Sequence, residues 1–322
     1  MAFASSVARR NFGVPVRSAF EEDVLRGLTA PRKHLSPKYF YDARGCELFD
    51  AITEQPEYYP TRAELEILRA NAGAITSLFP PNAALVEFGT GATTKARILL
   101  EGSATLKAYV PIDIAEEWLK EEAGRVQADF PHLLVRPVIA DFTSMIALPA
   151  DVRSLPRVGF FPGSTIGNFE PHEASAFLQR AATVLGAGAI LIVGVDRVKD
   201  TKVLNAAYND AAGVTAAFNL NLLTRINKEV GADFDVKSFE HHAFFNRPLS
   251  RVEMHLASRK RQRVRIDRET ILFRPGETIH TESSYKYTPD SFGALARGAG
   301  WAPVALWTDS AGYFSVHALA LR

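Results

Sequence analysis

The stretch between residues 84 and 195 alternates short apolar runs with helical patterns, and this alternation constrains the fold more than any other feature of the chain. Such an alternation is typical of βα units that build a parallel sheet. The expected strands are 84–88, 108–113, 134–140, 158–162 and 189–195, and the expected helices are 94–102, 115–130 and 172–185.

The pattern changes after residue 195. Residues 201–230 have the apolar spacing of a helix, and residues 251–287 alternate with period two, as antiparallel strands do. A helix over 291–298 and two strands, 302–308 and 314–321, are expected to follow. We therefore expect an α/β core with a seven-stranded sheet, formed by residues 63–198 and 289–322. Residues 1–62 are expected to join residues 199–288 in a second, inserted α+β lobe.

Composition excludes several classes of protein. Lys and Arg number 37 and Asp and Glu number 36, so there is no basic excess for nucleic acid or an anionic membrane. No run of about 18 apolar residues suggests a membrane span. A single cysteine, Cys46, excludes an internal disulfide and a Cys-based zinc site and fits a cytoplasmic compartment. The arginines among the first 20 residues would suit a transit peptide, but we favour a frayed polar N-terminus.

A ligand site is indicated where the first expected strand ends, in the sequence Glu87-Phe-Gly89-Thr90-Gly91. Glycines at such a turn let the backbone approach a ligand closely. The third glycine of a dinucleotide fingerprint would fall at position 94, where the chain has Thr94. The pyrophosphate-binding form of the motif is therefore incomplete, and alone the glycine turn is a weak signal.

Acidic residues close the next two expected strands. Asp113 can accept hydrogen bonds from both ribose hydroxyls, and Asp141 can accept from an adenine amino group while Phe142 packs on the ring. These positions favour a nucleoside without phosphates, S-adenosyl-L-methionine, and the closing strand pair resembles the antiparallel end of the class I (Rossmann-like) methyltransferase sheet. Lys95 either pairs with the methionine carboxylate or is a solvated helix residue.

Longer motifs carry a closer resemblance. They are PKYFYDARG (37–45), ELFD (47–50), PEYYPTR (56–62), GSTIGN (163–168), YNDAAG (208–213) and ESS (282–284). From about residue 20 to its C-terminus, the chain resembles the L-histidine Nα-methyltransferases of ergothioneine biosynthesis. The resemblance implies S-adenosyl-L-methionine-dependent trimethylation of the α-amino group of L-histidine to hercynine, the first step of that pathway.

The resemblance also implies which residues act. It assigns catalytic positions to Tyr41, which faces the amine, and Asn168, whose amide holds both the amine and the carboxylate of the amino acid. The implied substrate contacts are Tyr41, Phe49, Tyr58, Gly163, Asn168, Tyr208, Met254, Glu282 and Ser284. Aromatic walls suit the quaternary ammonium product, which is attracted to ring faces. Glu282 and Ser284 share one strand face and would read the imidazole.

The residues by themselves leave alternatives open. The tyrosines, Phe49 and Met254 could be core residues, Asn168 could stabilise its own turn, and Glu282 and Ser284 could lie on an exposed strand face beside Lys286. At the level of function, the alternatives are a nicotinamide-dependent oxidoreductase, a non-catalytic S-adenosyl-L-methionine-binding module, and a family member that methylates a tryptophan-like amino acid.

We expect no metal, because His241, His242 and His255 do not form a triad with carboxylates at helical spacing. The arginine-rich stretch over residues 259–268 is more typical of a solvated strand face than of a nucleic-acid groove. We expect a monomer that binds small molecules and neither nucleic acid nor a membrane.

Overall fold

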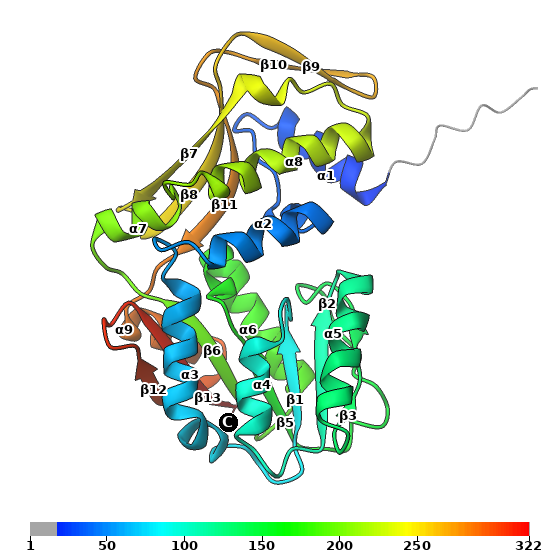
Figure 1. The fold of residues 1–322 in the computed structure, drawn as a ribbon, viewed down its shortest axis with the longest axis vertical. Coiled ribbons are helices and arrows are strands. Elements are labelled where there is room, and N and C mark those ends of the chain that lie inside the picture. Colours follow the sequence, from blue (N-terminus) through cyan, green and yellow to red (C-terminus); the bar gives the residue numbers. More distant parts are fainter. Residues whose placement is uncertain (1–17, 322) are drawn as a thin grey trace, which may run out of the picture.

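The helices and strands form two lobes, a lower one around a large sheet and an upper one around a smaller sheet (Figure 1). The computed structural model describes residues 18–321. The prediction for the N-terminus therefore lies mostly outside the described residues. No described helix has the length and apolar character needed to cross a membrane.

The lower sheet is mostly parallel and has the strand order β12-β13-β6-β5-β1-β2-β3. Its remaining strand, β4, also pairs with β2. β13 lies between β6 and β12 and runs antiparallel to both, and the other strand pairs of this sheet are parallel. The strands are β1 (Ala84–Phe88), β2 (Ala108–Asp113), β3 (Leu134–Val135), β4 (Val138–Ile139), β5 (Arg157–Phe161), β6 (Ile190–Asp196), β12 (Trp301–Thr308) and β13 (Phe314–Leu321).

The expected single strand over residues 134–140 is wrong. Pro137 has no N–H to donate to a sheet ladder, and the chain there divides into β3 and β4, which pair with different parts of β2. The other expected strands of the core form, with bounds shifted by at most one residue. The sheet thus has eight strands, of which β3 and β4 share one edge position.

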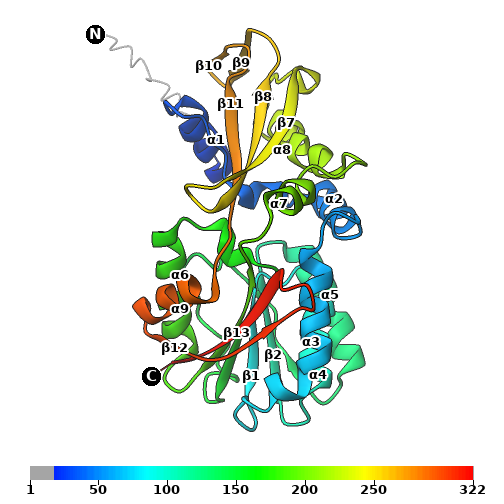
Figure 2. The same ribbon diagram turned by 90° about the vertical axis from the view of Figure 1, so that its left-hand side faces the viewer.

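Helices cover both faces of the lower sheet (Figure 2). On one face lie α3 (Pro60–Thr76), α4 (Thr94–Glu101) and α5 (Glu116–Asp129), and on the other lie α6 (Pro171–Leu185) and α9 (Pro289–Gly298). Alternate residues of β1 face opposite sides of the sheet, since Leu85 belongs to the same apolar cluster as Leu99, and Val86 belongs to the cluster that contains Phe177. Burial on both faces explains the continuous apolar runs in the sequence.

The upper lobe contains a three-stranded antiparallel sheet in the order β11-β8-β7 and a two-stranded hairpin of β9 and β10. One apolar cluster joins the N-terminal segment to the insertion. The elements are α1 (Ala19–Thr29), η1 (Pro37–Phe40), α2 (Ala43–Thr53), α7 (Thr201–Ala207), α8 (Val214–Val230), η3 (Val236–Ser238), β7 (Phe239–Asn246), β8 (Arg251–Ser258), β9 (Gln262–Ile266), β10 (Glu269–Phe273) and β11 (Thr278–Tyr285).

Two details of the upper lobe differ from the sequence prediction. The helical stretch 201–230 is split, because the Asp210 carboxylate accepts from the backbone N–H groups of Val214 and Thr215 and so caps a new helix, α8. Strand β7 was not predicted, since Glu240-His241-His242 obscures its alternation. On β9, Arg263 and Arg265 lie on an exposed face, as expected for a solvated strand.

The insertion leaves and re-enters the core at one place. Arg197, which follows β6, forms a parallel bridge with Tyr287, which precedes α9. The backbone N–H of Tyr287 donates to the carbonyl of Asp196 at 3.0 Å, and the N–H of Val198 donates to the carbonyl of Tyr287 at 3.1 Å. The outgoing and returning chains therefore run side by side.

Candidate active site

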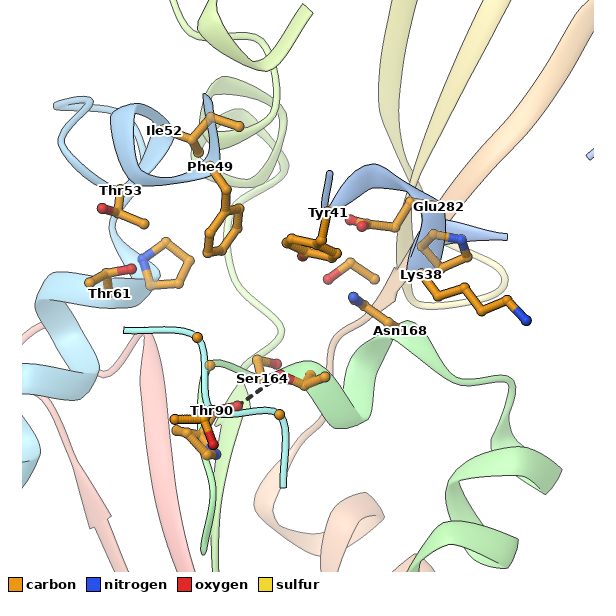
Figure 3. Close-up of a pocket in the computed structure, with 18 of the residues that line it drawn as sticks. Lys38, Tyr41, Phe49, Ile52, Thr53, Thr61, Thr90, Ser164, Asn168 and Glu282 are labelled. Atoms are coloured by element: carbon orange, nitrogen blue, oxygen red, sulfur yellow. Dashed lines mark hydrogen bonds between the residues drawn. The ribbon is translucent and has the colours of Figure 1, made fainter. Parts of the chain in front are cut away.

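One large pocket, with a volume of about 920 Å3, is lined by both lobes. Figure 3 shows Tyr41, Glu282 and Asn168 around one space, with the loop that carries Thr90 below them. All the residues predicted to bind donor or substrate line this pocket, except Glu87. The upper lobe and its N-terminal segment contribute the predicted substrate residues other than Gly163 and Asn168, and the lower sheet contributes the predicted donor residues.

Glu87, which was expected to bind the donor, does not line the pocket. Its side chain is fully buried within the sheet, where one carboxylate oxygen accepts a hydrogen bond from the Tyr109 hydroxyl. The other oxygen, Oε1, has no hydrogen-bond partner among the described residues. Burial raises the pKa of Glu87 to about 8.

The glycine turn and the acids of β2 and β4 meet at one end of the pocket. Gly89 has φ +71°, and a Cβ there would lie 3.0 Å from the Phe142 ring, so this position requires glycine. The Asp113 carboxylate accepts from the N–H groups of Ala115 at 3.0 Å and Gly91 at 3.4 Å, which fixes its position beside the turn. The Asp141 carboxylate accepts from the backbone of Thr143 at 2.8 Å.

Lys95 makes a contact that the sequence did not suggest. Its Nζ lies 2.6 Å from Oε2 of Glu64, a fully buried residue of α3. The same carboxylate accepts from the backbone N–H of Gly163 at 2.9 Å. Glu64 thus ties α3 to the helix after the glycine turn and to the turn after β5. Lys95 still lines the pocket, and neither of its two expected roles describes this ion pair.

Four aromatic side chains form the wall on the side of α2. The ring centroid of Tyr41 lies 5.7 Å from that of Phe49 and 5.9 Å from that of Phe218, and the centroid of Phe49 lies 6.4 Å from that of Tyr58. Phe218 lies on α8 and lines the pocket, a position that the apolar spacing of residues 201–230 did not predict. Burial raises the pKa of Tyr41 and Tyr58 well above the usual value, so both hydroxyls stay neutral.

Asn168 ends the short helix η2 (Thr165–Asn168) after β5. The turn before it has two consecutive residues with positive φ, Gly163 at +79° and Ser164 at +57°. The Ser164 hydroxyl accepts from the backbone N–H of Asp196 at 2.9 Å, which holds this strained turn in place. The Asn168 amide lines the pocket, and no side chain or backbone group in residues 18–321 bonds to it.

The floor of the pocket is a buried polar network around Asp196, at the end of β6. Lys286 lies 2.7 Å from Oδ2 of Asp196 and donates to Ser284 at 2.7 Å and to Tyr208 at 3.1 Å. On its other side, Asp196 binds Lys199 and accepts from the Tyr59 hydroxyl. The two lysines lower the pKa of Asp196 against the effect of burial.

Glu282 stands next to this network and has no hydrogen-bond partner within residues 18–321. Its side chain is 9% exposed, and burial raises its pKa to about 7, against the nearby charge of Lys286. Met254 pairs with Glu282 across β8 and β11 and also lines the pocket. A carboxylate, a hydroxyl and a thioether therefore face the aromatic wall.

One group in residues 18–321 has the geometry of a metal site, and it lies outside the pocket. Strand register brings Glu253, His255 and His280 together on the face of the upper sheet opposite Met254. The expectation concerned His241, His242 and His255 at helical spacing, whereas this group forms across two strands, so the absence of a metal stays a prediction. However, the Glu253 carboxylate already binds Arg251 at 2.8 Å and His255 at 3.0 Å, so a guanidinium balances its charge.

Together, the sheet with one antiparallel strand, the glycine turn after β1, the acid that ends β2 and the acid that follows β4 define a class I S-adenosyl-L-methionine-dependent methyltransferase. The family described as "Histidine-specific methyltransferase, SAM-dependent" matches residues 20–321. The chain belongs to this family.

Known relatives agree with this assignment. The chain is 41% identical over 314 residues to a protein named histidine N-alpha-methyltransferase from Mycolicibacterium smegmatis, a match that covers 94% of this chain and 95% of the relative. A protein of the same name from Mycobacterium tuberculosis is 42% identical, with 92% and 94% covered. Ergothioneine biosynthesis protein 1 from Neurospora crassa is 27% identical over 92% of this chain, but the match spans only 34% of that longer protein.

Proposed function

We propose that the protein transfers three methyl groups from S-adenosyl-L-methionine to the α-amino nitrogen of L-histidine, giving hercynine, and that this is the first step of ergothioneine biosynthesis. One observation carries the proposal: Glu282 and Ser284 lie side by side on one face of β11, opposite the aromatic wall and beside the donor end of the pocket. The names of the two mycobacterial relatives support the histidine substrate, and the name of the Neurospora relative supports the pathway.

The donor end fits an adenosyl ligand. Asp113 is an acceptor for the ribose hydroxyls, Asp141 is an acceptor for the adenine amino group, and Phe142 flanks the same space with an apolar ring. The backbone of Gly89, Thr90 and Gly91 can lie close to the donor, because the two glycines have no side chain that would project into the pocket. The positive charge of Lys95 lies toward Gly163, where the methionine part of the donor would meet the amino acid.

The amino-acid end is assigned to the substrate lobe, residues 1–62 and 199–288, together with the turn after β5. We assign the amine to Tyr41, Asn168 and the carbonyl of Gly163, and the carboxylate to Asn168 and Tyr208. The imidazole is assigned to Tyr58, Met254, Glu282 and Ser284. The aromatic wall of Tyr41, Phe49, Tyr58 and Phe218 suits a nitrogen that gains methyl groups and finally can no longer donate a hydrogen bond.

In the reaction, the sulfonium donor supplies an already activated methyl group. The nitrogen lone pair forms a bond to the methyl carbon while the carbon–sulfur bond breaks and its electrons stay on sulfur. The protein therefore mainly aligns the amine. Because Tyr41 and Tyr58 stay protonated, they orient the amine and do not remove its proton. One proton leaves to water before each of the three transfers, since only a neutral amine has a free lone pair.

Mass spectrometry of histidine or tryptophan, each incubated with the protein and S-adenosyl-L-methionine, tests the proposal. We expect trimethylated histidine, formed through mono- and dimethyl intermediates, and little methylated tryptophan. Methylation of tryptophan alone would favour the other aromatic substrate, and no methylated product from either would reject the proposal. The monomeric state and the cytoplasmic location stay predictions, which light scattering and cell fractionation can check.

A further inference from the structure

Glu170 is a charged residue beside the site that the reaction described above does not use. It follows Asn168 by two residues, immediately precedes α6, and does not line the pocket. Its carboxylate belongs to the lower lobe but binds two residues of the upper sheet. Oε1 accepts from Nη1 of Arg251 at 2.6 Å, and Oε2 accepts from the hydroxyl of Tyr285 at 2.6 Å. Glu170 therefore joins the two lobes next to Asn168.

The hydrogen bonds among these three side chains are mutually consistent. Tyr285 donates its single hydroxyl hydrogen to Glu170 and accepts from Nη1 of Arg251 at 2.8 Å. Nη1 carries two hydrogens, so it can donate to both partners at once. The Nε–H of Arg251 donates to Glu253 at 2.8 Å, which holds the guanidinium on the upper sheet. The partners of Glu170 thus have positions that β8 and β11 fix.

The backbone of the same segment also touches β11. A Cβ at Gly167 would lie 2.7 Å from the carbonyl oxygen of Tyr285 and 3.3 Å from its nitrogen, so this close approach requires glycine. On the side of the lower lobe, the ring centroid of Phe169 lies 5.6 Å from that of Phe177 on α6. Asn168 stands between Gly167 and Phe169 in the sequence and is therefore held from both lobes.

We propose that Glu170 is a positioning residue that fixes the distance between Asn168 and Glu282. This inference rests on the proposed function, in which Asn168 holds the amine and carboxylate of the amino acid and Glu282 binds its ring. Glu282 lies on β11, three residues before Tyr285, so the strand that binds the ring also holds the segment of Asn168. Glu170 thereby sets the length of the side chain that the site accepts.

A fixed distance has opposite effects on substrates of different length. Histidine has one methylene group between its α-carbon and its ring, and L-homohistidine has two. If the segment of Asn168 were free to move relative to β11, histidine would have to order it on binding, which costs affinity. The same freedom would let the longer amino acid reach both ends of the site. The contacts of Glu170 should therefore favour histidine over homohistidine.

The test compares Glu170→Gln and Tyr285→Phe with the wild type. Calorimetry in the presence of S-adenosylhomocysteine measures the affinities for histidine and for L-homohistidine. Each variant should bind histidine about three- to tenfold more weakly, bind homohistidine as well as the wild type or better, and keep its affinity for S-adenosylhomocysteine. The effect is modest because the side chain of Glu170 is 42% exposed, so water screens its ion pair.

Two outcomes of this comparison would overturn the inference. Equal losses of affinity for histidine and homohistidine would mean that Glu170 has a merely structural role. Unchanged affinities for both amino acids would mean that Gly167 and Phe169 hold Asn168 without help from Glu170. Because Glu170→Gln keeps the shape of the side chain and Tyr285→Phe removes only a hydroxyl group, the two variants provide independent measurements if one fails to fold.

Two matched controls remove similar groups that do not join the lobes. Tyr287→Phe deletes a buried hydroxyl group that has no hydrogen-bond partner within residues 18–321. Glu253→Gln changes the carboxylate that binds Arg251 from within the upper sheet. Neither control should change the ratio of histidine affinity to homohistidine affinity. A change in either as large as in Glu170→Gln would overturn the inference, because any disturbance near β11 would then suffice.

A double variant tests whether Tyr285 acts through Glu170. In Glu170→Ala the acceptor is absent, so adding Tyr285→Phe should change the affinity ratio no further. A further change as large as Tyr285→Phe causes in the wild type would overturn the inference. If the wild type methylates histidine, each of these contrary results leaves the proposed function standing. No methylation of histidine by the wild type would overturn both.

Discussion

Glu282 should impose a pH dependence on histidine recognition that differs from that of an ordinary carboxyl group. Burial raises its pKa to about 7, so the group is about 90% ionised at pH 8 and only about 3% ionised at pH 5.5. Only the ionised form accepts an imidazole N–H as a charged partner. Because the pKa is raised, the interaction is present above pH 7 and is lost as the pH falls through 7.

The perturbation is Glu282→Gln, which keeps the shape and leaves a neutral carbonyl acceptor. A hydrogen bond to a charged group contributes about 1.5–3 kcal/mol and a neutral one about 0.5–1.5 kcal/mol, so the loss is of order 1–1.5 kcal/mol, or roughly tenfold. The assay is kcat/KM for histidine in both proteins from pH 5.5 to 9. Titration of the substrate's own imidazole and amine is common to both proteins and cancels in their ratio.

The ratio of wild type to Glu282→Gln should rise about tenfold, with a midpoint near pH 7. A ratio near one at every pH would refute the assignment of Glu282 to the imidazole. A ratio already near tenfold at pH 5.5 would instead refute the argument from burial, because an ordinary glutamate, with a pKa of 4.5, is ionised there. Glu253→Gln serves as the control. Its carboxylate lies on the opposite face of the same sheet with a lowered pKa, so its ratio should stay flat over this range.

Three further substitutions separate the parts of the site. Asp113→Ala should weaken S-adenosyl-L-methionine binding about ten- to a hundredfold by calorimetry and leave histidine binding nearly unchanged, because the ribose loses a charged acceptor. Asn168→Ala should weaken histidine binding about ten- to a hundredfold and leave donor binding intact. Unchanged histidine affinity would mean that Asn168 only stabilises its turn. Phe218→Leu should weaken hercynine binding about two- to tenfold more than histidine binding, since the quaternary ammonium depends more on ring faces, and equal losses would argue against the aromatic wall.

The sequence predicted those features of the fold that depend on neighbouring residues. The apolar runs of the core, the glycine turn after β1 and the acid that closes β2 follow from local pattern, and the structure has them at the expected positions. The break at Pro137 could also have been predicted, because a proline inside an apolar run argues against a single strand. One strand was expected over residues 134–140 because the apolar pattern was weighted above the proline.

Contacts between distant segments could not be predicted in this way. Glu64 binds the backbone of Gly163, which is 99 residues away, and Tyr59 binds Asp196, which is 137 residues away. In the sequence, Glu64 is an unremarkable glutamate of an amphipathic helix, and Lys286 is the charged neighbour of a polar strand. Only the packing of α3, β6 and β11 shows that these charges are buried. Phe218 was missed for the same reason, because core and pocket positions share one helical periodicity.

The side-by-side stem of Arg197 and Tyr287 has a consequence for how such a protein can diversify. Because the two ends of the insertion are adjacent, the catalytic sheet accommodates some 90 residues as it would a short surface loop. Under the proposed function, changes at Met254, Glu282 or Ser284 of the inserted strands would alter which amino-acid side chain is accepted, while the strands at the donor end keep their sequence. The insertion and the sheet can change separately, because the chain passes between them at a single bridge.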